Sequence, residues 1–247
     1  MDPLAAHEGL IARLAELLAR RAPVLSEAHA CPYLAGRTAR QAFVLPKPLE
    51  PGLYHALMDL NMRRVGPVFY GTACDGCDQC RMLRLPVAEF RPTRAQRRCL
   101  ARNRDVAITL GMPEPSDEKL ALYRRYLAAR HDGQMDGSTA EFESFLYSSP
   151  LATLELVYRV GGRLLAVGIA DREPLALSAV YCYFDPEQER RSPGVLNVLR
   201  MIEEARIGGQ PFLYLGFHVR GSRAMEYKAC YRPCEIRQPD GRWLRHE

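Results

Sequence analysis

The order of predicted elements in the second half of the sequence constrains the fold more than any other feature. Three β-type runs follow one another, separated by turns at Gly161-Gly162 and Glu173-Pro174; the runs are Leu154–Arg159, Leu164–Asp171 and Leu175–Phe184. Ser192-Pro193-Gly194 then opens a helix to Arg206, with proline in its favoured first position, and Pro211–Val219 forms a further strand. We expect this last strand to lie parallel to the third.

Three meandering strands, a helix and a strand parallel to the third give the order of the GCN5-related acyltransferase fold, although many α+β domains share it. In that fold the third strand and the strand after the helix splay apart and leave unpaired backbone groups where an acyl donor sits. We therefore predict an α+β protein of two domains: a Cys- and Arg-rich N-terminal domain over 1–104 and an acyltransferase-like catalytic domain over 105–247.

The first half of the sequence predicts helices joined by short strands. Apolar periodicity and capping signals indicate helices over residues 8–22, 52–64, 93–103 and from 116 to about 131–133. The third of these begins with the capping box Thr93-x-x-Gln96. Short strands are expected at 41–45 and 82–87.

Composition excludes some protein classes. The chain of 247 residues has no apolar run of about 18 residues, so no membrane span is expected. Asp2 and Glu8 come where a signal peptide would carry basic residues, so the cytoplasm is the expected compartment.

Three cysteines stand at spacings of two residues, Cys74-x-x-Cys77-x-x-Cys80. Short loops of this kind let thiolates converge on one ion, as in the runs that hold iron–sulfur clusters. Arg84 occupies the fourth position of such a run, so a fourth ligand must come from elsewhere, with Cys31 first and Cys99 second. The spacing predicts a zinc or iron–sulfur site without separating the two, and the alternative is a loop of reduced thiols.

The cysteines lead into an arginine-rich segment. Residues 81–104 contain eight Arg and one acid, Glu89, which is a formal charge of +7 against +5 for the whole chain. On the helix over 93–103, Arg94, Arg98 and Arg102 fall on one face with Arg97 beside them. A concentration of unopposed arginines predicts contact with a phosphate backbone, and a solvated face is the alternative.

The helix that starts at Pro193 invites comparison with the acetyl-coenzyme A loop, R/Q-x-x-G-x-G/A, which offers backbone amides to a pyrophosphate. Arg191-x-x-Gly194-x-Leu196 matches two positions and fails at the last. We expect Leu196 to obstruct the close approach of a pyrophosphate, which favours an acyltransferase with a donor other than coenzyme A. The alternative is an ordinary helix that starts at proline.

Several motifs together resemble the bacterial aspartate/glutamate leucyltransferases, relatives of the arginyl-tRNA–protein transferases. The similarity covers about residues 30–243, and the Ser-Ala-Val-Tyr…Phe-Asp-Pro stretch is its most specific part. Gly71-Thr72 departs from the usual Arg-Pro, and Pro193 from a usual Leu. The motifs are Cys31-Pro-Tyr-Leu-x-Gly-Arg37, Tyr70…Cys74-x-x-Cys77-x-x-Cys80-x-x-x-Arg84, Phe90-Arg-Pro-x-Arg-x-Gln-Arg-Arg98, Tyr123-x-x-Tyr126-x-x-x-Arg130-His131, Leu177-Ser-Ala-Val-Tyr-Cys-Tyr-Phe-Asp-Pro186, Arg191-Ser-x-Gly194, Tyr214-Leu-Gly216 and Met225-x-Tyr-Lys228.

The resemblance implies an aminoacyltransferase that moves leucine from leucyl-tRNA to proteins beginning with Asp or Glu and so marks them for N-degron proteolysis. Transfer of arginine to the same acceptors is the alternative, and only the resemblance favours leucine over arginine. Two further alternatives remain open: a coenzyme A-dependent N-acetyltransferase, and a non-enzymatic RNA-binding or redox-sensor module built on the Cys and Arg segments.

For leucyl transfer, the candidate site residues fall into two groups. Asp171, Tyr181 and Asp185 are candidate proton acceptors or amine anchors, and each also suits a turn or a core position. Candidate substrate-binding residues are Arg84, Arg97 and Arg98 for the acidic acceptor, Arg191 and Gly194 at the helix start, and Lys228 for the terminal nucleotides.

Overall fold

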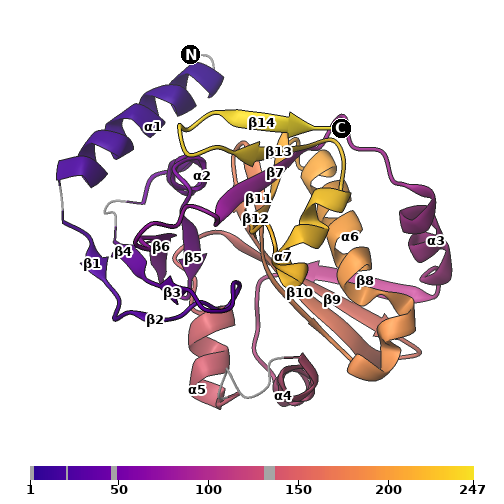
Figure 1. Ribbon diagram of the computed structural model, residues 1–247. Helices are drawn as coiled ribbons and strands as arrows, with labels where there is room; N and C mark the ends of the chain where they lie inside the picture. Colours follow the sequence, from indigo (N-terminus) through magenta and orange to yellow (C-terminus); the bar gives the residue numbers. More distant parts are fainter. Residues whose placement is uncertain (1–2, 21, 46–48, 131–136) are drawn as a thin grey trace.

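The computed structural model describes residues 3–20, 22–45, 49–130 and 137–247 (Figure 1). Among these residues the strands form sheets of eight, four and two members, and the large sheet has the order β14-β13-β7-β12-β11-β10-β9-β8. Its strands are β7 (Arg81–Pro86), β8 (Val106–Gly111), β9 (Thr153–Val160), β10 (Arg163–Glu173), β11 (Ala176–Phe184), β12 (Phe212–His218), β13 (Cys234–Arg237) and β14 (Trp243–His246).

The predicted strand order of the second half is confirmed. Strands β9, β10 and β11 form an antiparallel meander, and helix α6 (Pro193–Ile207) then returns the chain so that β12 lies parallel to β11. A 3₁₀ helix, η2 (Pro186–Arg191), joins β11 to α6. This is the α+β arrangement of the GCN5-related acyltransferase fold.

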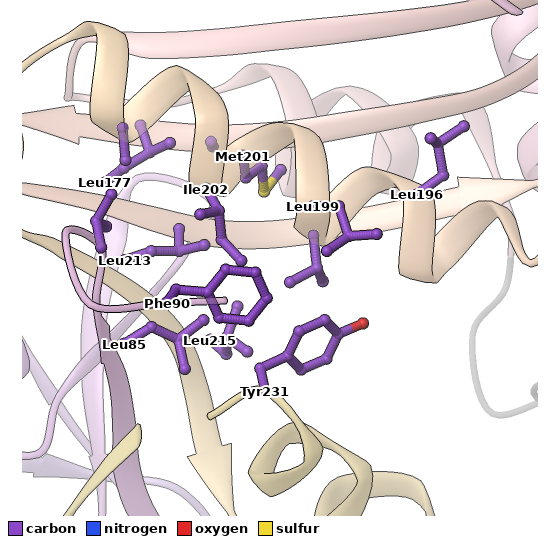
Figure 2. Close-up of a cluster of buried hydrophobic side chains, with 14 of the residues drawn as sticks. Leu85, Phe90, Leu177, Leu196, Leu199, Met201, Ile202, Leu213, Leu215 and Tyr231 are labelled. Atoms are coloured by element: carbon purple, nitrogen blue, oxygen red, sulfur yellow. The ribbon is translucent and has the colours of Figure 1, made fainter. Parts of the chain in front are cut away.

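Helices cover both faces of the large sheet. On one face α6 packs with α3 (Arg94–Arg102), and Figure 2 shows Leu199 and Ile202 of α6 on the side of Leu213 and Leu215 of β12. On the other face lie α4 (Asp117–Arg130), α5 (Thr139–Phe142) and the π-helical turn η1 (Glu143–Tyr147), whose apolar side chains join those of β10 and β11. Because side chains of a strand point to opposite faces, β10 contributes Leu165 and Ala170 to the core under α6, and Val167 and Ile169 to the core on the other face.

Leu196 corrects one expectation. Its side chain is only 1 % exposed and belongs to the core beneath α6. It therefore does not stand in front of the helix start, and the predicted obstruction of a pyrophosphate is wrong.

A small sheet beside the large one is built from the first part of the chain. Its order is β1-β4-β6-β5, with a separate two-stranded ribbon of β2 and β3, and its core continues under α1 and α2. The elements are α1 (Pro3–Arg20), β1 (Val24–Leu25), β2 (His29–Ala30), β3 (Thr38–Ala39), β4 (Gln41–Val44), α2 (Leu53–Asp59), β5 (Arg63–Val65) and β6 (Val68–Thr72).

The helix predicted over residues 52–64 is wrong at its C-terminal end. Helix α2 ends at Asp59, Asn61 adopts a positive φ of 65°, and Arg63–Val65 pairs with β6 as an antiparallel hairpin around Gly66-Pro67. The other predicted helices of the first half are present, with α3 carrying the predicted capping box. The predicted end of the fourth helix, at 131–133, lies outside the described residues.

Strand β7 joins the two parts of the chain. It pairs with β12 on one side and β13 on the other, although it precedes residue 104. The division at residue 104 stays a prediction, and the large sheet crosses it. Short helices α7 (Arg223–Glu226) and η3 (Tyr227–Cys230) follow β12. Within the described part of the chain, every helix is too short or too polar to cross a membrane.

Candidate functional site

A gap opens in the middle of the large sheet. Parallel pairing of β11 with β12 is confined to Ala176–Ser178 and Phe212–Tyr214, after which the strands diverge. Each strand also has a register shift here against its other neighbour: β11 between Ala179 and Tyr181, and β12 between Tyr214 and Gly216. Such bulges bend a strand and end its pairing. The predicted splay is therefore present, with two bulges facing one another.

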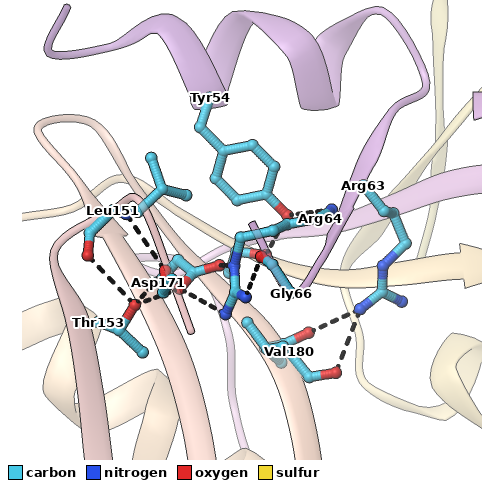
Figure 3. Close-up of polar contacts among 11 residues, drawn as sticks. Tyr54, Arg63, Arg64, Gly66, Leu151, Thr153, Asp171 and Val180 are labelled. Atoms are coloured by element: carbon cyan, nitrogen blue, oxygen red, sulfur yellow. Dashed lines mark hydrogen bonds and ion pairs between the residues drawn. The ribbon is translucent and has the colours of Figure 1, made fainter. Parts of the chain in front are cut away.

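The side chain of Arg63 reaches into this gap from the small sheet (Figure 3). Its Nη2 donates to the carbonyl oxygens of Ala179 at 3.1 Å and of Val180, the unpaired residue of the β11 bulge, at 3.3 Å. On the opposite strand Gly216 has a φ of 78°, and a Cβ there would overlap the guanidinium. Arg63 was missed because the sequence placed it in a helix; the signal was the Val-Gly-Pro-Val turn of a hairpin.

The next residue, Arg64, has the opposite environment. Its guanidinium is buried and binds Asp171 in a fork, Nε to Oδ2 at 2.7 Å and Nη2 to Oδ1 at 3.0 Å (Figure 3). Thr153 donates to the same carboxylate, and Asp171 has no exposed surface. Asp171 therefore joins the small sheet to the large one, and its predicted role as proton acceptor or amine anchor does not fit a carboxylate sealed in an ion pair.

Arg84, a predicted acceptor-binding residue, is also fully engaged. It donates to Asp59 at 3.2 Å and Glu235 at 2.7 Å, and its guanidinium lies 4.0 Å from the ring centres of Phe212 and Trp243. A sandwiched, doubly paired guanidinium of this kind stabilises the junction of β7 with its neighbours. The predicted grip on a substrate carboxylate does not fit this position.

A histidine pair completes that buried network. His7 of α1 hydrogen-bonds Asp59 at 2.9 Å, and His55 of α2 lies 3.0 Å from the hydroxyl of Tyr214. Burial lowers the pKa of His55 to about 3, so it is neutral at physiological pH. Among the described residues, His7, His55 and Asp59 form the one set of three ligand atoms close enough for a metal. The two rings stack at 3.8 Å and 14°, so their in-plane lone pairs do not converge on one ion.

Helix α3 carries the predicted cationic face beside the start of α6. Cys99 and Asn103 bond to backbone carbonyls at the junction of η2 with α6, which fixes α3 there. The described structure has no carboxylate within 4.0 Å of the arginines on this helix, whose numbers are 94, 97, 98 and 102. Arg97 and Arg98, which were predicted to bind the acceptor, belong to this helix and lie outside the strand gap.

The helix start itself is partly occupied by protein. Arg191 binds Asp105 in a fork, with both distances at 2.9 Å, at the edge of the α3 surface. Gly194 lies in the first turn of α6 against the ring of Phe184. The amides of this turn have no side-chain cap from Ser192, which leaves the helix start open to an anion.

Three further predicted residues lie around β11 and η3. Tyr181 packs against the rings of Tyr123 and Phe145, and burial raises its pKa, so it stays protonated and is no base. Asp185 caps η2 through the amide of Glu187. Lys228 is only 6 % exposed and donates to the carbonyl of Phe217 at 2.7 Å, so it does not lie on a surface that nucleotides could reach.

The four predicted metal-binding cysteines line one small cavity. Cys31, Cys74, Cys77 and Cys80 surround about 50 Å³ between the 31–37 loop and β12. Burial, then the charges of the other three thiols, raise the pKa of Cys80 to about 12. Four thiols around one cavity are donors that zinc or an iron–sulfur cluster takes, but within the described residues no three of these sulfurs lie within 4.8 Å of one another. Cys80 would have to lose its proton to bind a metal.

Comparison with known proteins gives one family. A model described as the N terminus of arginine-tRNA-protein transferase matches residues 29–98, and the model of its C terminus matches residues 118–238. Together they cover most of the chain; the first match ends within α3 and the second begins at the start of α4.

Curated relatives carry a more specific name. Aspartate/glutamate leucyltransferase of Hahella chejuensis (strain KCTC 2396) is 40% identical over 219 residues, 87% of this chain and 93% of that protein. The protein of the same name from Halorhodospira halophila (strain DSM 244 / SL1) is 44% identical over 213 residues, 84% of this chain and 90% of its own.

A solved structure shares the fold at low sequence identity. The C-terminal domain of a protein assigned as a lysylphosphatidylglycerol synthetase, from Agrobacterium fabrum, superposes with a TM-score of 0.50. The match covers 93% of this chain and 90% of that one at 12% identity, so the similarity is one of fold.

Proposed function

Because this chain belongs to the arginine-tRNA-protein transferase family, we propose that it transfers leucine from leucyl-tRNA to the α-amine of proteins that begin with Asp or Glu. The observation that carries the proposal is the gap between β11 and β12, which offers an acyl-transfer site in a chain whose relatives bear the leucyltransferase name. We expect the activity in the cytoplasm, because the proposed donor is leucyl-tRNA.

The chemistry asks little of the protein beyond alignment. The neutral α-amine attacks the ester carbonyl of leucyl-tRNA, an amide bond forms, the ester bond breaks, and the amine proton leaves as the ribose oxygen gains one. The ester is activated and an α-amine has a pKa near 8, so a useful fraction of the acceptor is neutral without a strong base. Hydrogen-bond donors along the unpaired edges of the gap can stabilise the developing oxyanion.

We propose that the tRNA lies across α3 and the start of α6. The arginines of α3 have no acidic partners among the described residues, and the first turn of α6 lies beside them. A helix start and a row of guanidinium groups both favour phosphate. Phosphates bound there would bring the acceptor end of the tRNA to the edge of β11 that faces the gap.

The four cysteines would hold zinc or an iron–sulfur cluster with a structural role. The ion would tie the loop at Cys31 to the loop over Cys74–Cys80, beside the end of β12. Metal analysis of protein purified without oxygen should find one zinc ion or one cluster per chain, and Cys77→Ser should lower that content. This assignment would be overturned if the purified protein contained no metal and a chelator left its melting temperature unchanged.

The test of the proposed function uses the purified protein with labelled leucyl-tRNA and arginyl-tRNA. Peptides beginning with Asp, Glu, Lys and Ala serve as acceptors. We expect leucine on the Asp and Glu peptides alone. Arginine in place of leucine would support the alternative suggested by the family's description.

A coenzyme A-dependent acetyltransferase is the remaining alternative, and acetyl-coenzyme A should leave the melting temperature unchanged. Arg63 fills the gap with hydrogen bonds to Ala179 and Val180, so a donor threaded between these strands would displace it. Protection by acetyl-coenzyme A together with no transfer from aminoacyl-tRNA would refute leucyl transfer.

A further inference from the structure

The gap contains a cation, Arg63, that forms no ion pair with the described residues, and Asp171 acts on it only over a longer distance. Within the described parts of the chain, no carboxylate oxygen lies within 4.0 Å of the Arg63 guanidinium, whereas Arg64 and Arg84 each bind at least one. Nη2 of Arg63 donates to the carbonyl oxygens of Ala179 and Val180, but its Nε and Nη1 make no hydrogen bond to the residues described. These N–H groups are available to a ligand that enters the gap.

Arg63 is held in this position from several sides. The bulge of β11 turns two carbonyl oxygens toward it, and Gly216 gives the room that a side chain would take. Its backbone is fixed by Arg64, whose amide donates to the hydroxyl of Tyr54 at 3.2 Å and whose side chain is locked to Asp171. A cation with so little freedom loses little entropy when it binds an anion.

The surroundings leave Arg63 as the basic group that keeps its positive charge, so its partner should be a negatively charged group. Burial, and then the charge of Arg63, lower the pKa of Lys228 well below its ordinary value. Of the two basic groups near the gap, Lys228 therefore gives up its proton more readily and Arg63 keeps its charge. Leaving a half-buried guanidinium without a counter-ion is costly, so a carboxylate supplied by a bound substrate completes the site.

We propose that Arg63 binds the side-chain carboxylate of the N-terminal Asp or Glu of the acceptor and thereby sets its specificity, an inference that rests on the proposed leucyl transfer. In an N-terminal aspartate only three bonds separate the α-nitrogen from the carboxylate carbon. The group that selects the acid must therefore lie within a few ångströms of the point of attack. Arg63 meets this requirement, whereas Arg84 is already paired and Arg97 and Arg98 lie on α3.

The test compares Arg63→Gln, Arg63→Lys and the matched surface control Arg242→Gln, which lies in the turn between β13 and β14. Acceptor peptides begin with Asp or its neutral isostere Asn, and kcat/KM is measured for leucine transfer to each. Binding of the same two peptides is measured without tRNA. Melting temperature and affinity for leucyl-tRNA report whether a variant is folded and still binds the donor.

Arg63→Gln should reduce the Asp-over-Asn ratio of kcat/KM by at least about 100-fold, because the site loses the fixed charge that faces the acceptor carboxylate. Arg63→Lys, which keeps the charge, should keep the ratio within about tenfold of the wild type. Leucyl-tRNA affinity should change little in either variant. A purely structural role would affect both variants and both peptides alike, and the Asp-over-Asn ratio would not move.

Two outcomes separate this inference from the proposed function. If the wild type transfers leucine and Arg63→Gln keeps the wild-type preference for Asp, the role of Arg63 is refuted and leucyl transfer stands. If the wild type transfers no leucine but binds the Asp peptide more tightly than the Asn peptide, and Arg63→Gln abolishes that difference, the acid-binding site stands and the proposed reaction falls.

Discussion

Arg63 and Arg64 are neighbours in one short strand, yet they belong to two different regions of the molecule. Arg64 lies in the junction between the small and large sheets, where Asp171, Asp59, Arg84 and their partners satisfy one another. Arg63 lies in the strand gap, where no described acid meets it. The comparison teaches that buried charges here are structural where they are paired, and that an unpaired cation marks the place for a substrate.

The largest expected effect tests the paired side of this comparison. Arg64→Gln leaves the carboxylate of Asp171 buried without its cation and should lower the free energy of unfolding by about 3–5 kcal/mol. Arg63→Gln should lower it by less than about 1 kcal/mol, because only hydrogen bonds to two carbonyls are weakened. Urea unfolding measures both. Equal losses in the two variants would break the distinction between the two regions.

A pH effect of intermediate size comes from His55 in the same junction. Its folded-state pKa of about 3 lies below its unfolded value of 6.5, so between these values the unfolded chain binds the extra proton. Stability attributable to neutral His55 is therefore present above pH 6.5 and is lost as the pH falls. Between pH 7.5 and pH 5 the loss should be about 2 kcal/mol.

His55→Leu isolates this effect, because the difference in unfolding free energy between wild type and variant should shrink by that amount over the same pH range. Glu173 works in the opposite direction: burial raises its pKa to about 7, so its contribution is lost as the pH rises. Glu173 is present in both proteins and cancels in the difference. A difference independent of pH would show that His55 titrates normally.

The smallest effect concerns the unpaired arginines of α3. Arg98→Gln should weaken leucyl-tRNA binding about fivefold at 0.15 M salt and reduce the slope of log K against log salt by about one. Stability should be unchanged, because Arg98 is exposed. Arg242→Gln is the control and should alter neither quantity. If Arg98→Gln behaves like the control, the tRNA lies elsewhere.

Local patterns predicted much of this fold. The β9–β12 order, the start of α6 at Pro193 and the capping box at Thr93 are each encoded within a few residues, and all are confirmed. The strands β8, β13 and β14 were not predicted, because their pairing partners lie far along the chain or they are short and polar.

The site was harder to predict because its contacts are long-range. Asp171 and Arg64 are 107 residues apart, so nothing near Asp171 shows that its charge is already used. Arg63 was placed in a helix because Leu53–Asp59 is helical and Asn61 ends it through a positive φ that its neighbours do not signal. The splay could be predicted from the order of the strands and helix, and the α3 surface from the spacing of its arginines.

Strand β7 has a consequence for the protein while it is being synthesised. Its partners β12 and β13 leave the ribosome more than one hundred residues after it, so both of its edges wait unpaired during that time. An unfinished chain with open strand edges is prone to pair with other chains. For the same reason a fragment cut after residue 104 would remove the strand that pairs with both β12 and β13, and neither piece should fold as the intact protein does.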